Sequence, residues 1–468
     1  MGAITKAWTR AWAADVTKTN LTAQAFGLHD LTTDAMADAV AEWFSLYFRR
    51  EPDDVEDPCQ RLPYTIVHKL QKTVFAEYVS SIANAQGSKG GKTNWMDANR
   101  RAADKIKKQA MQWALVGGAV LLKPVPDVEH FHFTALRRDA YVVFGRGPGG
   151  ELTDVGCCEF TDADKHHYTL AERRTVTPEG VGIRYRLYQS ETRGVLGRRV
   201  PLSALSAYAQ LPEQMTLPGV HGIGLVEMRL PMANCVDGSE DGVSVYAAAM
   251  GLIHNINRNE RQYDAEFENG RSRVFASSDV LETDENGRRH LADDIFEGID
   301  DSSHNVGVTV YNPTLRDESF ERRKQSYLKA CENIIGLKRG ILSDVEAAEH
   351  TATEITSSDG DYNLSIVDLQ NTWFDALRAA LVLCDEIGKA YKLCDTAPWD
   401  TEQLTVSWGN GVLYDKRQEW LDDLAAVQAG LLRPEIALAH KYDLPWDTAA
   451  DLAAIRQKYM PELADLKM

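Results

Sequence analysis

Hydrophobic residues recur at every third or fourth position through much of residues 32–114, which predicts a run of helices. Each helix has one apolar face, and we expect that face to pack on a core. The members of the three faces are Met36, Val40, Trp43, Phe44 and Tyr47, then Ile66, Leu70, Val74, Tyr78 and Ile82, and then Ala103, Ile106, Ala110, Trp113 and Ala114. Residues 51–58, between the first two helices, are acids and prolines that we expect at the surface.

After Gly117 the pattern changes to short runs of β-branched and aromatic residues. Residues 120–122, 141–144 and 183–187 are predicted strands. Pro178-Glu179-Gly180 separates two runs, residues 173–177 and 181–188, and this arrangement predicts a β-hairpin. Helices followed by hairpins indicate an α+β unit, which we expect to end near Asp237.

Two helices with a small β element between them are predicted next. Residues 245–268 contain no proline and predict one continuous helix. The Asn286-Gly287 pair is a strong hairpin signal, and residues 306–311 are a predicted strand. Residues 316–335 predict the returning helix, which Gly336-Leu337 is expected to close. In such an arrangement each helix covers the apolar stripe of the other.

An acidic segment then leads into a long helix. Residues 340–377 contain no Lys or Arg. Their acids are Asp344, Glu346, Glu349, Glu354, Asp359, Asp361, Asp368 and Asp375. Thr351-Ala352-Thr353-Glu354 fits a capping box at the helix start. The apolar stripe of the helix comprises Tyr362, Ile366, Leu369, Trp373, Leu377, Ala380, Cys384, Ile387 and Tyr391. A surface of one charge sign repels polymers of the same sign.

The chain finishes with a strand and two helices. Residues 404–408 alternate and predict a strand that closes the β unit, which would make that domain discontinuous. Residues 416–429 and 449–459 predict helices. The expected fold class is therefore α+β.

Several short motifs occur in a fixed order along the second half of the chain. They are Asp294-Ile295-Phe296-Glu297-Gly298, Tyr311-Asn312-Pro313-Thr314-Leu315-Arg316, Gly336-Leu337, the capping box from Thr351 to Glu354, Leu413-Tyr414-Asp415 and Ala429-Gly430-Leu431-Leu432. In this order they resemble the portal protein of bacteriophages, the head-to-tail connector, in the type found in long-tailed phages of Gram-positive hosts. The return strand departs from that family, because Gly409-Asn410-Gly411 stands where an acidic residue is expected.

The resemblance implies a portal-like fold with a mixed α/β wing, a two-helix stem, a small β clip, a long tunnel helix and a helical C-terminal region. The implied parts are the wing at 1–240, the first stem helix at 241–270, the clip at 271–313, the second stem helix at 314–338, the tunnel loop at 339–350, the tunnel helix at 351–395, the return strand of the wing at 396–412 and a helical crown at 413–468.

The function that the resemblance implies is structural. About twelve copies would form a ring-shaped channel at the capsid vertex, for packaging and ejection of double-stranded DNA and for joining head to tail. The implied partners are further copies of the chain, the double-stranded DNA in the channel, the large subunit of the terminase, a head-tail adaptor, and the major capsid and scaffolding proteins. The implied location is the virion, after assembly in the host cytoplasm. No enzyme activity, cofactor, metal or membrane is implied.

The resemblance also assigns candidate site residues. The tunnel-loop residues expected to line the DNA channel are Asp344, Glu346, Glu349 and His350. The expected cap of the tunnel helix is Thr351 with Glu354. The basic candidates of the clip and stem are Arg271, Arg273, Arg316 and Arg322, in a cluster with Arg258, Arg261, Arg323 and Lys324. We expect i, i+4 pairs with nearby glutamates to engage most of these bases, and the remainder to face neighbouring subunits or DNA.

The composition agrees with this interpretation. The 468 residues are 44% hydrophobic and carry a net charge of −18. This length allows two or more compact units. Wrapping DNA requires clustered Lys and Arg, whereas an acidic channel lets a polyanion slide through it. The seven cysteines lack zinc or disulfide spacing and indicate reduced thiols in a cytosolic protein. No apolar run approaches the ~18 residues of a membrane span.

Three other patterns resemble catalytic or ligand sites. Residues 87–93 resemble a phosphate loop, but Gln86 stands where its first glycine belongs, so we expect an ordinary loop. His130 and His132, with His166-His167 nearby, lack a carboxylate or cysteine at ligand spacing. The acids of residues 344–354 resemble a two-metal nuclease site, with only His350 as a base. The alternative functions are therefore a phage DNA-processing enzyme, such as a metal-dependent nuclease, or a non-portal soluble scaffold.

Overall fold

The computed structural model describes residues 21–48, 60–83, 91–127, 130–270, 273–276, 281–283, 287, 289–291, 308–311, 314–344, 352–395, 397, 399–409, 416–442, 444–446 and 448–460. The chain divides into two compact units. The first comprises Met1–Tyr47, Pro63–Ala247 and His350–Met468, and the second comprises Phe48–Leu62 and Ala248–Glu349. Helices and antiparallel strands occur together, so the expected α+β class is confirmed.

The described part of the first unit opens with helices. They are α2 (Leu21–Phe26), α3 (Asp34–Phe48), α4 (Leu62–Val74) and α5 (Lys92–Gly117). On α3, all five members of the predicted apolar face are buried. Gly118, which follows α5, has a φ of +80°, and a Cβ there would lie 2.2 Å from the backbone of Gly242. Only glycine fits this turn, which leads directly into the β region.

The second predicted apolar face is wrong beyond Val74. The helix ends at Val74. Tyr78 lies in the connection that follows, and Ile82 belongs to the strand β1 (Val79–Ile82). The Tyr78 hydroxyl donates to Asp104 of α5 at 2.6 Å, and the Ser80 hydroxyl donates to the same carboxylate at 2.5 Å. Tertiary hydrogen bonds therefore override the local helical spacing in this segment.

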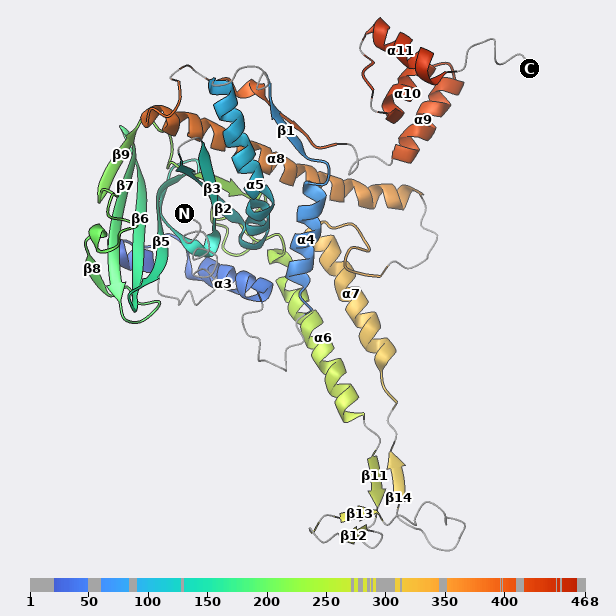
Figure 1. Ribbon diagram of the computed structural model, residues 1–468. Helices are drawn as coiled ribbons and strands as arrows, with labels where there is room; N and C mark the ends of the chain where they lie inside the picture. The colour runs from blue at the N-terminus through green and yellow to red at the C-terminus, as the bar shows by residue number, and fades with distance from the viewer. Residues whose placement is uncertain are drawn as a thin grey trace, which may run out of the picture. The chain divides into compact units, whose positions relative to one another are not determined.

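Two antiparallel sheets form most of the β structure of the first unit (Figure 1). The smaller sheet has the order β10-β2-β3, with β2 at Ala119–Pro126, β3 at Phe131–Arg137 and β10 at Val226–Arg229. The larger has the order β4-β5-β6-β7-β8, and β9 also pairs with β7. Its strands are β4 (Tyr141–Arg146), β5 (Leu152–Ala163), β6 (His166–Thr177), β7 (Gly180–Ser190), β8 (Arg198–Val200) and β9 (Gln214–Pro218). The predicted hairpin is confirmed, because Thr177 pairs with Gly180.

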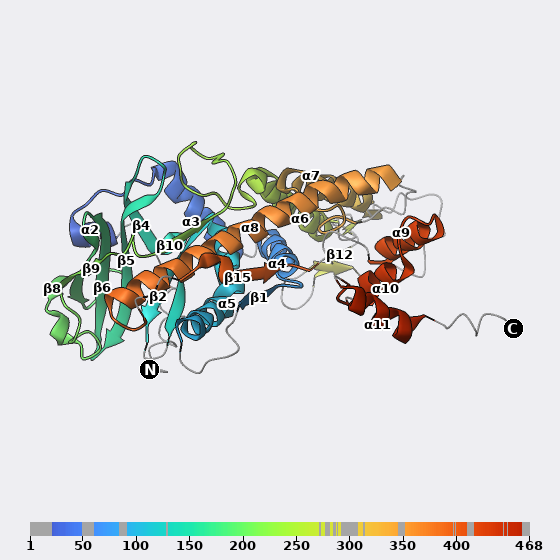
Figure 2. The same ribbon diagram turned by 90° about the horizontal axis from the view of Figure 1, so that it is seen from above.

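The long helix α8 (Ala352–Ala390) runs beside α5 and over β2 and β10 within the first unit (Figure 2). Every member of its predicted stripe from Ile366 to Ile387 is buried, which confirms that part of the stripe. Tyr391 lies past the end of the helix and is 43% exposed. The indole N–H of Trp373 donates to the Tyr78 hydroxyl at 3.2 Å, so the helix is held by a polar contact as well as by its apolar face.

β15 (Leu404–Ser407) is the predicted return strand, but its partner differs from the expected one. It forms a two-stranded antiparallel sheet with β1, in which Val406 lies opposite Ser80. The expectation that it closes the main β unit is therefore wrong. The strand has a partner here because α4 ends early and leaves residues 79–82 extended.

Three helices form the described C-terminal part, α9 (Lys416–Gln428), α10 (Pro434–Tyr442) and α11 (Ala449–Tyr459). The sequence predicts α9 and α11, whereas α10 was not expected. Pro434 is its first residue, where proline is favoured because the N–H it lacks would have no partner in the helix. His440 of α10 lies 2.9 Å from Asp423 of α9, and the ammonium of Lys441 lies 4.1 Å from the Trp420 ring centre.

The second unit contains two helices and short strands. Its elements are α6 (Met250–Asn269), β11 (Arg273–Ala276), β12 (Leu281–Thr283), β13 (Arg289–Leu291), β14 (Val308–Tyr311) and α7 (Asp317–Ile335). Figure 1 shows α6 and α7 side by side, leading to the antiparallel pair β11–β14. The antiparallel pair β12–β13 flanks Gly287, whose φ is +77°, so the hairpin lies where the sequence predicts it. Its last pair is Thr283 with Arg289, and the connection is therefore longer than the two residues that the Asn286-Gly287 signal indicates.

The start of α6 differs from the predicted helix. The α-helix begins at Met250, after a 3-10 turn at Ala247–Ala249. Tyr246, which falls within the predicted helix, is instead buried in the first unit, and its hydroxyl donates to the carbonyl of Trp43 at 3.0 Å. This contact fixes the backbone just before the helix, so the regular spacing begins later than the sequence pattern predicts.

Candidate functional site

The helices α6 and α7 form an antiparallel pair, which we call the stem. An apolar seam joins them, with Ile256 of α6 and Leu328 and Cys331 of α7 buried. Closer to the strands, the rings of Tyr263 and Phe320 stack with their centres 5.3 Å apart. The seam covers one stripe of each helix, so the other faces of both helices carry polar side chains.

Two ion pairs cross the stem at different levels. Closer to the strands, Arg316 binds the carboxylate of Glu266 through its backbone N–H at 2.9 Å and through its side-chain Nε at 3.0 Å. Further along, the Lys324 ammonium lies 3.1 Å from the Glu260 carboxylate. The hydrogen bonds from Arg316 lower the pKa of Glu266, so this pair is charged at neutral pH. Together the pairs determine which residues of α6 and α7 lie at the same level.

The expected pairing of the basic candidates is wrong for Arg316 and Lys324. Both pair across the stem instead of at i, i+4 along their own helix. The reason is visible in the sequence, because Phe320 lies four residues from each of them and belongs to the apolar seam. The opposite helix offers each of them a carboxylate, whereas their own helix has none at a distance of four residues.

The other basic candidates have different surroundings. Arg258, Arg261 and Arg322 are exposed, and none has an ion-pair partner among the residues described. Arg323 donates to the Tyr327 hydroxyl at 3.1 Å. Arg273 lies in β11, but its side chain is outside the described part, as is all of Arg271. Whether Arg271, Arg273, Arg316 or Arg322 contacts DNA stays a prediction.

Glu332 holds the C-terminal end of α7 in two ways, through its backbone carbonyl and through its side-chain carboxylate. Its carbonyl accepts from the N–H groups of Gly336 and Leu337, and Gly336 has a φ of +76°, so the predicted helix end is confirmed. Its fully buried carboxylate accepts from the N–H of Leu342 at 2.6 Å, and from the N–H and hydroxyl of Ser343 at 2.9 and 2.7 Å. The segment that leads to the acidic loop is therefore tied to the stem.

Asp344 is the one tunnel-loop candidate that the described residues include. It is exposed, its carboxylate accepts from the amide of Gln325 at 3.0 Å, and its N–H donates to the same side chain at 2.8 Å. Glu346, Glu349, His350 and the cap Thr351 lie outside the described residues, as does the side chain of Glu354. The helix α8 starts at Ala352, directly after the expected cap. The roles of these residues stay predictions.

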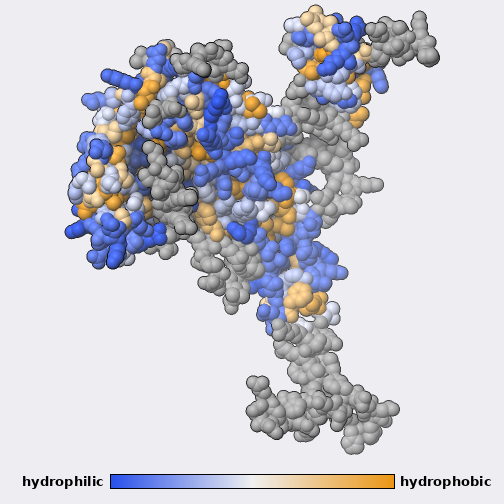
Figure 3. Space-filling view, in the orientation of Figure 1, coloured by the Kyte–Doolittle hydropathy of each residue, from blue (hydrophilic) through white to orange (hydrophobic). Residues whose placement is uncertain are grey.

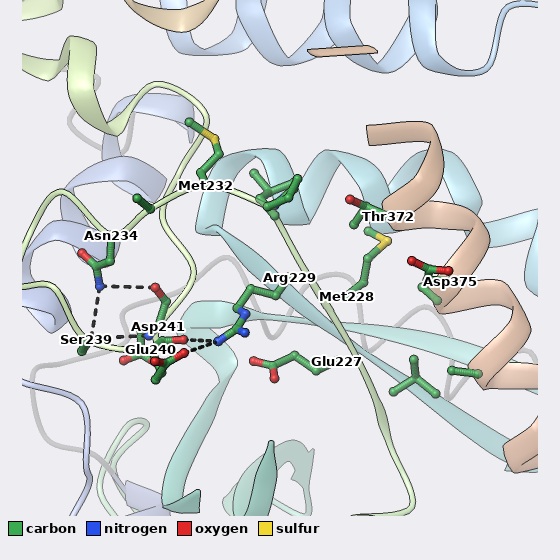
Figure 4. A pocket seen from close by; sticks show the side chains of 16 residues that line it. Glu227, Met228, Arg229, Met232, Asn234, Ser239, Glu240, Asp241, Thr372 and Asp375 are labelled. Atoms are coloured by element: carbon green, nitrogen blue, oxygen red, sulfur yellow. Dashed lines mark hydrogen bonds and ion pairs between the residues drawn. The ribbon is translucent and has the colours of Figure 1, made fainter. Parts of the chain in front are cut away.

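A recess of about 730 Å³ lies in the first unit, between residues 226–241 and one side of α8 (Figure 4). Thr372 and Asp375 of α8 form one wall, and Arg229 and Asp241 lie on the other. Asp241 accepts from Arg146 at 2.7 Å and lies 3.3 Å from Arg138, while Arg229 donates to the backbone carbonyl of Glu240 at 2.5 Å. Arginines therefore already engage Asp241 and Glu240.

Glu227 is the most perturbed acid of this recess. Burial raises its pKa, and Arg146, 3.6 Å away, opposes that shift. A raised carboxyl pKa often marks a catalytic acid, but such an acid needs a second group placed to act with it. Of the other lining acids, Asp241 and Glu240 are bound by arginines, and Asp375 is exposed on the opposite wall, so the recess is better explained as a charge-paired structural region. Sequence reasoning missed it, because Arg146 and Asp241 lie on separate elements far apart in the chain.

The patterns that resembled other sites have structural partners. Lys92, at the edge of the glycine-rich loop, pairs with Asp385 of α8 at 2.6 Å, whereas residues 84–90 lie outside the described part. His132 lies 2.7 Å from Asp127, and His167 lies 2.6 Å from Asp162. Within the described ranges, no group of three or more metal-ligating side chains is found. No described helix is long and apolar enough to cross a bilayer.

Comparison with known proteins gives structural likenesses alone. No protein-family model matches the sequence, and no curated protein matches it. The neck of a native GTA particle, computed with C12 symmetry, is similar over 91% of this chain and 99% of that chain, with 13% identity and a TM-score of 0.45. The neck of an empty GTA particle, computed with C6 symmetry, is similar over 90% and 98%, with the same identity and TM-score. Likeness at this level does not establish a shared function.

Proposed function

We propose that the chain is a phage portal protein, a structural subunit of a ring-shaped channel for double-stranded DNA at the capsid vertex. The observation that carries the proposal is the arrangement of the second unit and the helix after it. A helix, short strands and a returning helix form one compact unit, and the chain then passes through an acidic segment into the 39-residue α8. The order of motifs along the second half of the sequence, which resembles that of the portal family, also supports the proposal.

The acidic segment supports a role in contact with passing DNA. Asp344, Glu346, Glu349 and His350 would line the channel, with Thr351 and Glu354 capping the helix behind them. Twelve copies of a chain with a net charge of −18 would carry roughly −200 charges, and such a channel repels a polyanion instead of binding it. Repulsion from all sides keeps the DNA centred and mobile.

The strands at the tip of the stem would be the docking part. In the proposed particle they would contact the large subunit of the terminase during packaging and the head-tail adaptor afterwards, while other surfaces meet the major capsid and scaffolding proteins. The protein would reside in the virion after assembly in the host cytoplasm. Its role needs no cofactor and no catalysis, so the purified protein should neither hydrolyse ATP nor cut DNA.

Mass measurement in solution tests the proposal. The full chain should form a closed assembly whose mass is a fixed multiple of 52.1 kDa, at micromolar concentration and in at least one of several salts. Several salts are needed because portal subunits of this kind can stay monomeric until ring formation is nucleated, so one buffer is not enough. A monomer or dimer under every condition, together with metal-dependent DNA cleavage that Asp344→Asn with Glu346→Gln abolishes, would establish a nuclease instead.

A further inference from the structure

The outer face of α6 is basic in its middle, whereas the exposed Glu268 lies further along the same stripe. Helical spacing places Arg258 and Arg261 on the side of α6 opposite to the seam residues Ile256 and Tyr263. Both arginines are exposed and have no ion-pair partner among the described residues. Hydrophilic residues predominate over the described part of the stem in the view of Figure 3. A partner of this face must therefore offer charge more than apolar surface.

The outer face of α7 carries charges of both signs, two glutamates and two cations. The residues Glu318, Glu321, Arg322, Gln325, Ser326 and Lys329 form one helical stripe and line a recess of about 550 Å³. Helical spacing places this stripe away from the seam residues of α7. Glu318 and Glu321 are exposed, and neither has a cation partner among the residues described, although Glu321 accepts from the Gln325 amide at 2.8 Å.

The two faces lie at matching levels of the stem. The pair Glu260–Lys324 sets one level, and the pair Glu266–Arg316 sets another. Arg261 follows Glu260 directly, and in the antiparallel α7 the level just beyond Lys324 is that of Glu321 and Arg322. Arg261 and Glu321 are therefore at nearly the same level, on opposite sides of the stem.

We infer that in the ring of the proposed function, on which this inference rests, the basic face of α6 in one copy docks into the recess on α7 of the next copy, with Arg261 against Glu321. Two different faces of one chain then form a head-to-tail contact. When the ring axis is parallel to the stem, the rotation that relates one copy to the next does not move residues along the stem. Partners in a closed ring must consequently lie at one level, as Arg261 and Glu321 do.

DNA is the other polyanionic partner that the arginines of α6 would suit. Glu318 and Glu321 are exposed acids with no cation partner among the residues described, and Glu321 lies at the level of Arg261 on the far side of the same stem, which favours a second copy of the chain. Arg258, adjacent to Arg261 on the face, would then approach Ser326 of the neighbouring recess, whose hydroxyl can accept a hydrogen bond.

Charge exchange between the two faces tests this interface. The variants are Arg261→Glu, Glu321→Lys and the double variant, with Lys72→Glu on the exposed side of α4 as the matched control. Each single variant should raise the protein concentration for half-assembly by about two- to five-fold or more, most strongly at low salt. The double variant should recover to within about twofold of the original chain, because the attraction is restored with its direction reversed. The control should assemble normally.

Circular dichroism should show every variant folded, because all three positions, Arg261, Glu321 and Lys72, are exposed. If a reversal fails to fold, Arg261→Ala and Glu321→Gln replace it and should weaken assembly to a smaller degree. Normal assembly by both single variants would overturn the interface while leaving the proposed ring intact. If Arg261→Glu weakens assembly and the double variant does not restore it, the interface would also be overturned. Absence of any ring in the original chain would instead contradict the proposed function itself.

Discussion

The buried carboxylate of Glu332 accepts two hydrogen bonds from Ser343, one from its N–H at 2.9 Å and one from its hydroxyl at 2.7 Å. A third comes from the N–H of Leu342 at 2.6 Å. These bonds join the last turn of α7 to the beginning of the acidic segment. The place where that segment leaves the stem is therefore determined by one carboxylate.

Glu332→Gln should destabilise the second unit by about 2–3 kcal/mol, because the three hydrogen bonds lose their charge assistance and the Ser343 hydroxyl has to turn to accept from the new amide N–H. Ser343→Ala should cost about 1 kcal/mol, since it removes one donor and leaves the two backbone bonds in place. Urea unfolding of the full chain measures both values. If Glu332→Gln lowers the unfolding free energy by no more than Ser343→Ala does, the carboxylate does not hold the segment.

Glu172 should make the first unit sensitive to acid. Burial alone would raise its pKa, but Lys123 at 2.5 Å and Arg174 at 2.6 Å outweigh burial and lower the pKa to about 2. A depressed pKa gives stability that is fully present above the ordinary value near 4.5 and lost as pH falls from there toward 2. The loss should be on the order of 3 kcal/mol. Unfolding measured between pH 5 and pH 2 checks this.

Glu172→Gln is the control for the same experiment. It should lower stability at neutral pH, because Lys123 and Arg174 keep their charges in a buried site without the carboxylate. Its unfolding free energy should also change less between pH 4.5 and 2 than that of the original chain. An unchanged pH dependence in Glu172→Gln would assign the acid sensitivity to other carboxyl groups.

Replacing residues 271–313 by a short linker should leave the rest of the chain folded. The seam and the ion pairs of the stem lie outside this range, so the stem keeps its own contacts. The variant should no longer bind the terminase or the tail-side adaptor, and packaging should stop. Binding assays with both partners, beside a thermal melt, measure this. Retained packaging would contradict the proposed docking role of the tip.

Changing Asp344, Glu346 and Glu349 to Lys should slow DNA passage. The triple variant places phosphate-binding cations in the channel, and each contact adds affinity that weakens as salt increases. Assembly should persist, packaging should be poor at low salt, and partial rescue should follow at high salt, where the screening length falls below its physiological value of about 8 Å. The Asn/Gln variant of the same residues should be affected mildly. Normal packaging by the triple Lys variant at every salt would mean that these residues do not face DNA.

Local periodicity predicted the elements whose apolar faces are continuous. Met36 to Tyr47 on α3 and Ile366 to Ile387 on α8 are buried as the spacing indicates, because a helix with one wide apolar face has few other ways to pack. The spacing of Tyr78 and Ile82 fitted the same rule but failed, since Asp104 of α5 binds the two hydroxyls of this segment. Competing contacts of that kind come from residues far away in the sequence, so the local spacing of apolar residues cannot predict them.

The candidate site, like the fold, could be predicted from the sequence only in part. The glycine and the leucine at 336–337 predicted the end of α7, because the left-handed turn needs glycine locally. The pairing of Arg316 with Glu266 could not be predicted from the sequence, since it depends on how the two stem helices align. The charge-paired recess around Asp241 was missed for the same reason, because its arginines come from β4 and from the turn that precedes it.

Negative-stain microscopy of the purified full-length chain, taken after solution conditions that favour assembly, tests the central claim most directly. The account predicts ring-shaped particles of uniform size, with an axial hole and rotational symmetry in end-on views. Compact particles of one or two subunits without a hole, at micromolar concentration and in every salt tried, would contradict it.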